Sequence, residues 1–266
     1  MWLSSFRAFL GSRTTGIDNH PDPTWRGSAT PPSSSSLFGQ NLLLRRGPTV
    51  VKGQLLFRPA PQIDEFTARA KARLTVDPEA GFPEIQAWQR LRRARRETHQ
   101  YRCASEALPR RLRLDGSLPR LHPLVDLCNA ISVAHAIPVA VLDTNRISGD
   151  LTLRHARADE EHLTFAGTTE RPEPGKVIFA DTAGRAHARR WTNRQSCHSA
   201  VRAETTNVLI VAEALHATAA DLLTALLARL GTTWPAPTGH AVLTGPVPAY
   251  DVPPIPLGAT HPSTHS

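Results

Sequence analysis

The sequence has few cysteines, few aromatic residues and little lysine, and several common signatures are missing. Three cysteines in 266 residues (Cys103, Cys128 and Cys197) are too few and too unevenly spaced for a disulfide scaffold. No apolar run reaches the roughly 18 residues of a membrane span. Phosphate-loop, dinucleotide-binding, zinc-protease and Gly-x-Ser-x-Gly patterns are absent, so we expect no cofactor and no metal. These absences predict a soluble protein of the reducing cytoplasm, without contact to a membrane.

The chain is apolar enough to fold, but its two ends differ from its middle. Hydrophobic residues make up 40% and charged residues 20%, which excludes a wholly disordered chain. The 23 prolines are too many for an ordinary globular fold, and many lie near the ends. Pro31 and Pro32 precede four serines, a low-complexity pattern. We therefore expect a poorly ordered leader at 1–48, a folded domain at 49–232 and a proline-rich tail at 233–266.

Hydrophobic periodicity within the expected domain predicts helices at both ends and strands between them. Helices are expected at 63–74, 83–97, 123–131 and 218–230, the third with Pro123 in its first turn. Strands are expected at 139–142, 151–154, 163–165, 177–179, 186–191 and 207–211, separated by turn residues. Helices followed by a block of strands and a closing helix predict an α+β fold.

Positive charge is concentrated in two stretches. The formal net charge is +8, yet residues 88–113 carry nine arginines against two acids, and 182–203 carry five arginines and no acid. Clustered arginine is typical of proteins that bind phosphates, so RNA is an expected partner. The candidate RNA-binding residues are Arg92, Arg93, Arg95, Arg96, Arg110, Arg111, Arg189 and Arg190. The alternatives are solvated helix faces and the arginine bias of a GC-rich genome.

Polar residues interrupt segments that are otherwise apolar enough to be buried. Asp126, Asn129 and Ser132 follow one another at i, i+3 steps along one expected helix. Buried polar groups are costly unless they are hydrogen-bonded, so these three form either an internal network or the polar wall of a pocket. Asp143 at a strand end and Arg194 in a polar loop are similar candidates. No residue can be assigned as catalytic, and the chain is either an enzyme or a binding protein.

Several of these polar residues belong to a series of short motifs in a fixed order. The series runs Arg102-x-x-Ser105-Glu106-Ala107-Leu108, Val125-Asp126-x-x-Asn129, Ile137-Pro138-x-x-x-x-Asp143, Pro174-Gly175-Lys176-Val177, Asp181, Trp191-x-x-Arg194 and Thr205-x-Asn207-Val208-Leu209. In that order the motifs resemble the free-standing proteins built on the B3/B4 domain, the editing module of the bacterial phenylalanyl-tRNA synthetase beta subunit. The resemblance covers residues 85–215.

The resemblance implies a three-layer α+β fold with a β-sandwich and flanking helices, and a pocket between its subdomains. In the synthetase this pocket hydrolyses tyrosine mistakenly esterified to the phenylalanine tRNA. Two synthetase editing residues do not carry over, because Ala140 stands where the synthetase has histidine and Val211 where it has glutamate. Glu213 lies two positions downstream of Val211, which is a shift and not a match.

The resulting hypothesis is a stand-alone domain that binds the aminoacyl end of tRNA and removes a wrong amino acid in trans. The alternative is a non-catalytic protein that binds RNA, an amino acid or a related metabolite. By itself the chain is not expected to charge tRNA. The pocket candidates are Arg102, Ser105, Glu106, Asp126, Asn129, Ser132, Asp143, Arg194 and Thr205.

Overall fold

The computed structural model describes two long segments and several separate strands. The segments are residues 60–94 and 104–216, and the outlying positions are 26–28, 40–46, 50–51, 54–55, 218, 219, 221, 222, 225, 238–243 and 249–251. Side chains are described for 61–91, for 104–216 and for 218, 219, 221, 222 and 225. Within this part of the chain, no helix is both long and apolar enough to cross a membrane.

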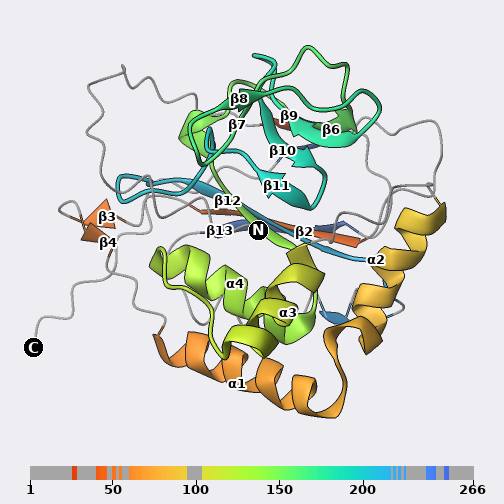
Figure 1. Ribbon diagram of the computed structural model, residues 1–266. Coiled ribbons are helices and arrows are strands. Elements are labelled where there is room, and N and C mark those ends of the chain that lie inside the picture. The colour runs from red at the N-terminus through yellow and green to blue at the C-terminus, as the bar shows by residue number, and fades with distance from the viewer. Residues whose placement is uncertain are drawn as a thin grey trace, which may run out of the picture.

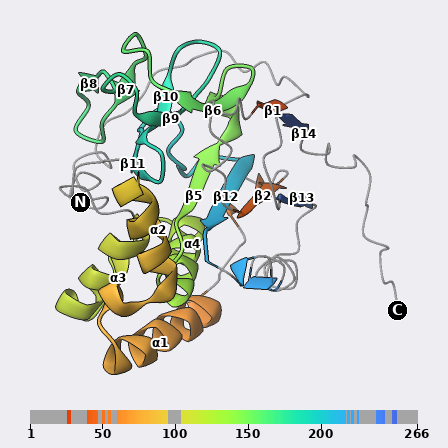
Figure 2. The same ribbon diagram turned by 90° about the vertical axis from the view of Figure 1, so that its right-hand side faces the viewer.

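The described elements form three layers, with helices below, one sheet in the middle and a second sheet above (Figure 1). The helices are α1 (Ala60–Val76), α2 (Pro83–Ala94), α3 (Ala104–Asp115) and α4 (Pro123–His135), with short 3-10 turns η2 (Glu79–Gly81) and η3 (Thr144–Arg146). The view turned by a quarter shows the same order of layers (Figure 2). The predicted α+β class is confirmed.

The middle sheet has the strand order β13-β2-β12-β5 and the upper sheet the order β11-β10-β9-β6-β1-β14. The middle sheet consists of β2 (Gln40–Arg46), β5 (Val139–Asp143), β12 (Val208–Ala214) and β13 (Thr238–Leu243). The upper sheet consists of β1 (Arg26–Ser28), β6 (Leu151–His155), β9 (Val177–Ala180), β10 (Ala186–Arg190), β11 (Asn193–Gln195) and β14 (Ala249–Asp251). Two further hairpins pair β3 (Val50–Val51) with β4 (Gln54–Leu55) and β7 (His162–Leu163) with β8 (Thr169–Glu170).

Strand β12 is buried along its whole length and pairs antiparallel with β2 on one side and β5 on the other. Its Val-Leu-Ile-Val run suits a central strand because β-branched and aliphatic side chains pack well on a pleated surface. Alternate residues point to opposite faces. Val208 and Ile210 therefore pack in the core over the helices, whereas Leu209 and Val211 pack toward the upper sheet.

Helix α4 fills the core below β12 and confirms the helix predicted to begin with Pro123. The Nδ1 atom of His122 accepts a hydrogen bond from the backbone N–H of Leu124 (3.2 Å), which caps the first turn. The helix ends at His135, and the next residue, Ala136, has a φ of 53°, the left-handed conformation common after a helix C-terminus. Its apolar residues, among them Leu127 and Ile131, pack against α1 and β12 in one cluster.

Helix α3 was not predicted, because Pro109 lies in its middle and the segment is rich in arginine. Proline removes one helical hydrogen bond and normally disfavours a helix interior. The buried residues Leu108 and Leu112 pack with Ala70 of α1 and Val133 of α4. Tertiary burial of this apolar face therefore outweighs the local cost of the proline.

The predicted strand limits are close to the observed ones, apart from three differences. The strand expected at 163–165 is the short β7, β10 ends one residue before Trp191, and the strand expected at 207–211 is β12, which continues to Ala214. The polar loop expected around Arg194 contains the short strand β11. The helix expected at 218–230 and the end of the helix expected at 83–97 lie largely outside the described residues. Strands β1 and β2 fall within the expected leader and β13 and β14 within the expected tail, and the domain limits stay a prediction.

The α4 core supplies a stability test. Leu127→Ala removes a fully buried side chain, and truncation of such a leucine typically costs about 2–5 kcal/mol of unfolding free energy. Leu114→Ala is the matched control, because Leu114 is 59% exposed and surface changes usually stay within about 0.5 kcal/mol. Urea denaturation measures both variants. Equal stabilities of the two variants would contradict the assignment of this core.

Candidate functional site

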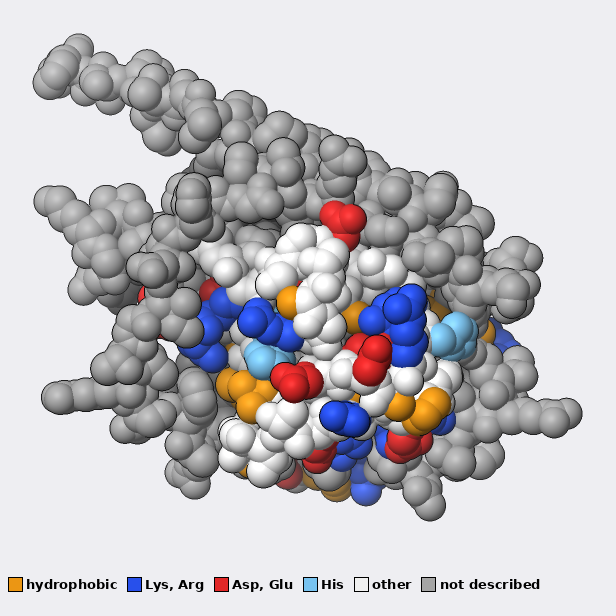
Figure 3. Space-filling model, turned by 90° about the horizontal axis from the view of Figure 1, so that it is seen from above, with side chains coloured by type: hydrophobic (Ala, Val, Ile, Leu, Met, Phe, Trp, Pro, Cys, Tyr) orange, Lys and Arg blue, Asp and Glu red, His pale blue; other side chains and the backbone are white. Residues whose placement is uncertain are grey.

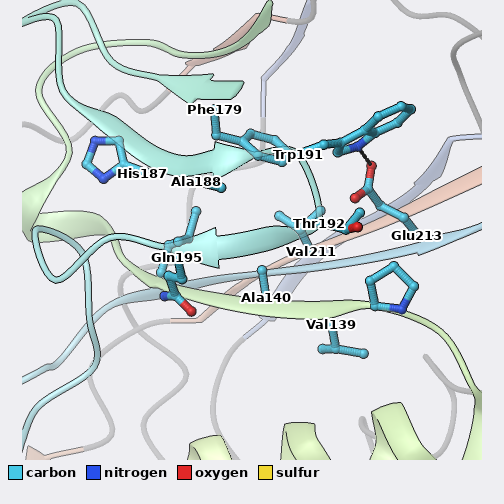
Figure 4. A pocket seen from close by; sticks show the side chains of 12 residues that line it. Val139, Ala140, Phe179, His187, Ala188, Trp191, Thr192, Gln195, Val211 and Glu213 are labelled. Carbon is cyan, nitrogen blue, oxygen red and sulfur yellow. Dashed lines mark hydrogen bonds between the residues drawn. The ribbon is translucent and has the colours of Figure 1, made fainter. Parts of the chain in front are cut away.

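A pocket lies between the middle and upper sheets (Figure 4). Its lining residues come from β5 and the residue before it, from β9, β10, β11 and β12, and from the turn after β10. They are Pro138, Val139, Ala140, Leu142, Phe179, His187, Ala188, Trp191, Thr192, Gln195, Val211 and Glu213. Most of the lining is apolar, as is usual for sites that bind small organic groups.

Ala140 and Val211 lie side by side in the pocket lining. They are direct partners in the antiparallel pairing of β5 with β12. In such a pair the two side chains point to the same face of the sheet. These are the two positions at which the sequence departs from the synthetase's histidine and glutamate, so both departures change one small area of the same pocket.

Glu213 also lines the pocket, from two residues further along β12. Because side chains alternate along a strand, residues two apart share a face, and Glu213 lies on the face of Val211. Its Oε1 accepts a hydrogen bond from Nε1 of Trp191 (2.7 Å), drawn as the dashed line in Figure 4. Burial raises the pKa of Glu213 to about 7, although this hydrogen bond acts in the opposite direction. Sequence reasoning dismissed this residue, and the period-two spacing was the signal for it.

Trp191 lines the pocket and has an unusual backbone conformation. Its φ is 45°, which is uncommon for any residue but glycine and costs on the order of 1–2 kcal/mol. The backbone N–H of Trp191 donates to the carbonyl of Val177 (2.6 Å), which fixes the turn. Its indole meets that of Trp88 edge to face, with ring centroids 5.3 Å apart. Helix α2 thereby supports the pocket wall.

One pocket-lining residue, His187, lies next to the buried Asp181. His187 Nε2 is 3.1 Å from Asp181 Oδ2. Burial alone would raise the pKa of Asp181, but interactions with His187 and with backbone N–H groups lower it to about 2. Two of those donors are the backbone N–H groups of Arg185 and Ser148. This carboxylate therefore organises the loop after β9. Among the described residues, no group of His, Cys, Asp and Glu could hold a metal ion.

The predicted polar residues of α4 lie on the helix below the sheet and are not among the pocket lining residues. Ser132 Oγ donates to the carbonyl oxygen of Ile137 (2.6 Å), and Asp126 Oδ1 accepts from the backbone N–H of Leu121 (2.8 Å). Asn129 is buried on the same helix. The contacts of Ser132 and Asp126 are those of an internal network, and a ligand-binding role for these residues stays a prediction.

Asp143 and Thr205 are brought together, although they are far apart in the sequence. Thr205 Oγ1 donates to Asp143 Oδ2 (2.7 Å), and the backbone N–H of Asn145 donates to Oδ1 (3.0 Å). Burial raises the pKa of Asp143, and these hydrogen bonds oppose the shift. The hydrogen bond between them lies at the C-terminal end of β5, and neither residue lines the pocket.

The remaining pocket candidates are spread over other elements. Ser105 is buried and Glu106 half-buried on α3, and Arg102 lies outside the described residues. Arg194 is in β11 with a φ of 62°, and its carbonyl oxygen is 2.9 Å from Nε2 of His162. None of these described side chains lines the pocket.

The described members of the predicted RNA-binding set each lie near a carboxylate. Arg111 pairs with Asp115 (3.1 Å), and Arg110 lies 3.9 Å from Glu79. In the upper sheet, Arg189 pairs with Glu170 and Arg190 with Glu173. The face seen in Figure 3 accordingly shows basic and acidic side chains side by side. The side chains of Arg92, Arg93, Arg95 and Arg96 lie outside the described residues.

Replacement of Glu213 tests its environment. A folded-state pKa of about 7, above the ordinary value of 4.5, means that this group's contribution to stability is complete below about pH 4.5 and lost as pH rises through 7. Glu213→Gln has no charge to bury and can still accept from Trp191. We expect the variant and the wild type to have equal free energies of unfolding near pH 4.5. Near pH 8 the free energy of unfolding of the variant should be higher by about 2–3 kcal/mol.

Urea denaturation across this pH range measures the difference. Glu204→Gln is the control, because the Glu204 side chain is 62% exposed. If the difference in unfolding free energy between Glu213→Gln and the wild type is the same at every pH, burial does not raise the pKa of Glu213.

Comparison with known proteins identifies the segment that contains the site. The phenylalanine–tRNA ligase beta subunit of Mycolicibacterium paratuberculosis is 35% identical over 105 residues, which are 40% of this chain and 12% of that protein. The same subunit of Bradyrhizobium diazoefficiens is 34% identical over 79 residues, 30% of this chain and 10% of that protein. This chain therefore spans only about a tenth of these curated relatives.

A solved N-terminal fragment of the phenylalanyl-tRNA synthetase beta subunit from Pyrococcus horikoshii is also similar. It matches with a TM-score of 0.33 and 13% identity, over 41% of this chain and 40% of that one. The profile of the B3/4 domain matches residues 89–224, which include every pocket-lining residue. Because this match covers half of the sequence, the chain belongs to the B3/4 domain family.

Proposed function

We propose that this B3/4 domain binds aminoacyl-tRNA and hydrolyses a mischarged aminoacyl ester in trans, with the aminoacyl group in the pocket between the sheets. The relation to the phenylalanine–tRNA ligase beta subunit supports a function related to tRNA. The observation that carries the proposal is an apolar pocket inside the family segment whose described lining includes one carboxyl, that of the buried Glu213.

The chemistry of ester hydrolysis suits such a site. An aminoacyl ester is already activated, so a positioned water and hydrogen-bond donors near the carbonyl can accelerate its cleavage without a catalytic triad. Glu213 places a carboxyl inside the pocket, where it can orient the substrate for this attack.

A second candidate function is the binding of an amino acid or related metabolite without hydrolysis. Two observations favour it. Ala140 and Val211 offer no polar side-chain group to a reacting ester. The described arginines Arg111, Arg189 and Arg190 are close to carboxylates, which reduces their attraction for phosphates.

A deacylation assay with a panel of mischarged tRNAs distinguishes the two functions. We expect at least one ester to be cleared faster than in buffer, and Glu213→Gln to reduce that rate by about tenfold or more, since the substrate loses a hydrogen bond to a charged group, worth about 1.5–3 kcal/mol. Glu204→Gln, on the exposed surface, should retain the wild-type rate. If no ester in the panel is cleared faster than in buffer, hydrolysis in trans is refuted.

Salt dependence tests the tRNA partner separately from hydrolysis. Binding led by phosphate contacts releases counterions, so we expect tRNA affinity to fall by about tenfold or more between roughly 50 and 200 mM salt. Filter binding or fluorescence anisotropy with uncharged tRNA measures this change. Affinity that stays constant over the same range, or no binding at low salt, would favour the small-molecule function.

A further inference from the structure

We propose that Glu213 is the polar anchor of the pocket and binds a primary ammonium group, while the apolar lining receives an uncharged aliphatic or aromatic side chain. The ligand class is therefore an amino acid derivative with a free amine, such as the aminoacyl end of a charged tRNA. This inference deepens the proposed function by naming the chemistry that the same pocket recognises, and for the tRNA ester it rests on that proposal.

The position of the carboxyl is the first argument. Glu213 is only 5% exposed, yet it lines the pocket. Its backbone is fixed in the middle sheet, where the Glu213 N–H donates to the carbonyl of Pro138 (3.2 Å). An ionised carboxylate has about four acceptor positions. Trp191 Nε1 uses one of them, at Oε1. The carboxyl is thus held in place and retains capacity to accept hydrogen bonds from a ligand.

Charge balance is the second argument. None of the described lining residues is lysine or arginine. A buried carboxylate without a cation is costly, and for Glu213 burial raises the pKa to about 7. A ligand with an ammonium group supplies the missing positive charge. Its three N–H donors form charge-assisted hydrogen bonds, which are roughly twice as strong as neutral ones.

The hydrogen bond from Trp191 makes the carboxyl a better receptor for a cation. It is donated to a carboxyl oxygen of Glu213, lowers the pKa and therefore favours the ionised form. Trp191 is itself held by its turn and by the edge contact with Trp88. The receptor is consequently ordered before a ligand arrives, which reduces the entropy lost on binding.

The rest of the lining defines the other half of the ligand. Ala140, Val211 and Phe179 present only hydrocarbon surface to the pocket. Gln195 already donates its side-chain N–H to the carbonyl of Val141 (2.6 Å). A hydroxylated side chain would find little compensation for its lost hydration in this part of the pocket. Aliphatic and unsubstituted aromatic side chains lose no such hydration.

A pair of probes tests this assignment by calorimetry at about pH 8, where Glu213 is ionised. Phenylalaninol and 3-phenylpropan-1-ol differ only in the amine. We expect the wild type to bind phenylalaninol at least tenfold more tightly, and Glu213→Gln to bind the two compounds within about threefold, since the variant lacks the charge-assisted hydrogen bond to the amine. Glu204→Gln should keep the wild-type preference.

Three outcomes would overturn the assignment. In the first, the wild type binds both compounds equally or binds neither. In the second, Glu213→Gln keeps the preference for the amine. In the third, tyrosinol binds the wild type at least tenfold more tightly than phenylalaninol and this gain is lost in Glu213→Gln, which would mean that the carboxyl recognises a ring hydroxyl.

A further variant examines Trp191 as the positioning residue. Trp191→Phe keeps an aromatic ring but cannot donate to Glu213. We expect it to weaken phenylalaninol binding by about three- to tenfold and to leave the binding of 3-phenylpropan-1-ol unchanged, since a hydrogen bond to a charged group is lost. A variant that weakens both probes equally would show that Trp191 only packs against the ligand.

The probes contain neither tRNA nor an ester, so their result is independent of the proposed hydrolysis. A protein that prefers the amine but clears no mischarged tRNA loses the proposed function and keeps this ammonium site. A protein that clears an ester but ignores the amine keeps the proposed function and loses the site. The two failures are therefore distinguishable.

Discussion

The two-sided burial of strand β12 is the constraint on which the rest of the described structure depends. The strand pairs with β2 and β5, and each of its seven residues is buried. Because successive side chains point to opposite faces, Val208 and Ile210 must pack over the helices if Leu209 and Val211 pack toward the upper sheet. A slip of one residue would exchange these two sets, so the register is strongly specified. The same alternation places a carboxyl, that of Glu213, on the pocket face.

The electrostatics of the described surface are more balanced than the net charge of +8 suggests. Acids separated in sequence from the arginine-rich stretches fold back onto them. Arg113 Nε lies 2.8 Å from Oε2 of Glu79. Burial alone would raise the pKa of Glu79, but the contacts with Arg113 and Arg110 outweigh burial and lower the pKa. The described lining of the pocket, in contrast, contains no lysine or arginine, and His187 is its one basic side chain. The surface arginines are thus paired with carboxylates, whereas no lysine or arginine among the described lining residues pairs with the buried carboxyl of the pocket.

Sequence reasoning succeeded where local physics decides the outcome. Pro123 and the apolar run after it predicted α4, and the β-branched run at 207–211 predicted β12. It missed α3, because Pro109 is locally unfavourable and only packing against α1 and α4 compensates. The i, i+3 spacing of Asp126, Asn129 and Ser132 was recognised, but it does not reveal that Ser132 is bonded within the fold.

The sequence by itself determined the fold class, the strand and helix periods and the family motifs, because these depend on side chains that are close along the chain. Only the tertiary structure decided which polar residues share a pocket. Trp191 and Glu213 meet because a turn of the upper sheet lies over the end of β12. Ala140 and Val211 meet because β5 pairs with β12 in one register. Such contacts join residues that are distant in sequence, and strand pairing and burial set them, not local spacing.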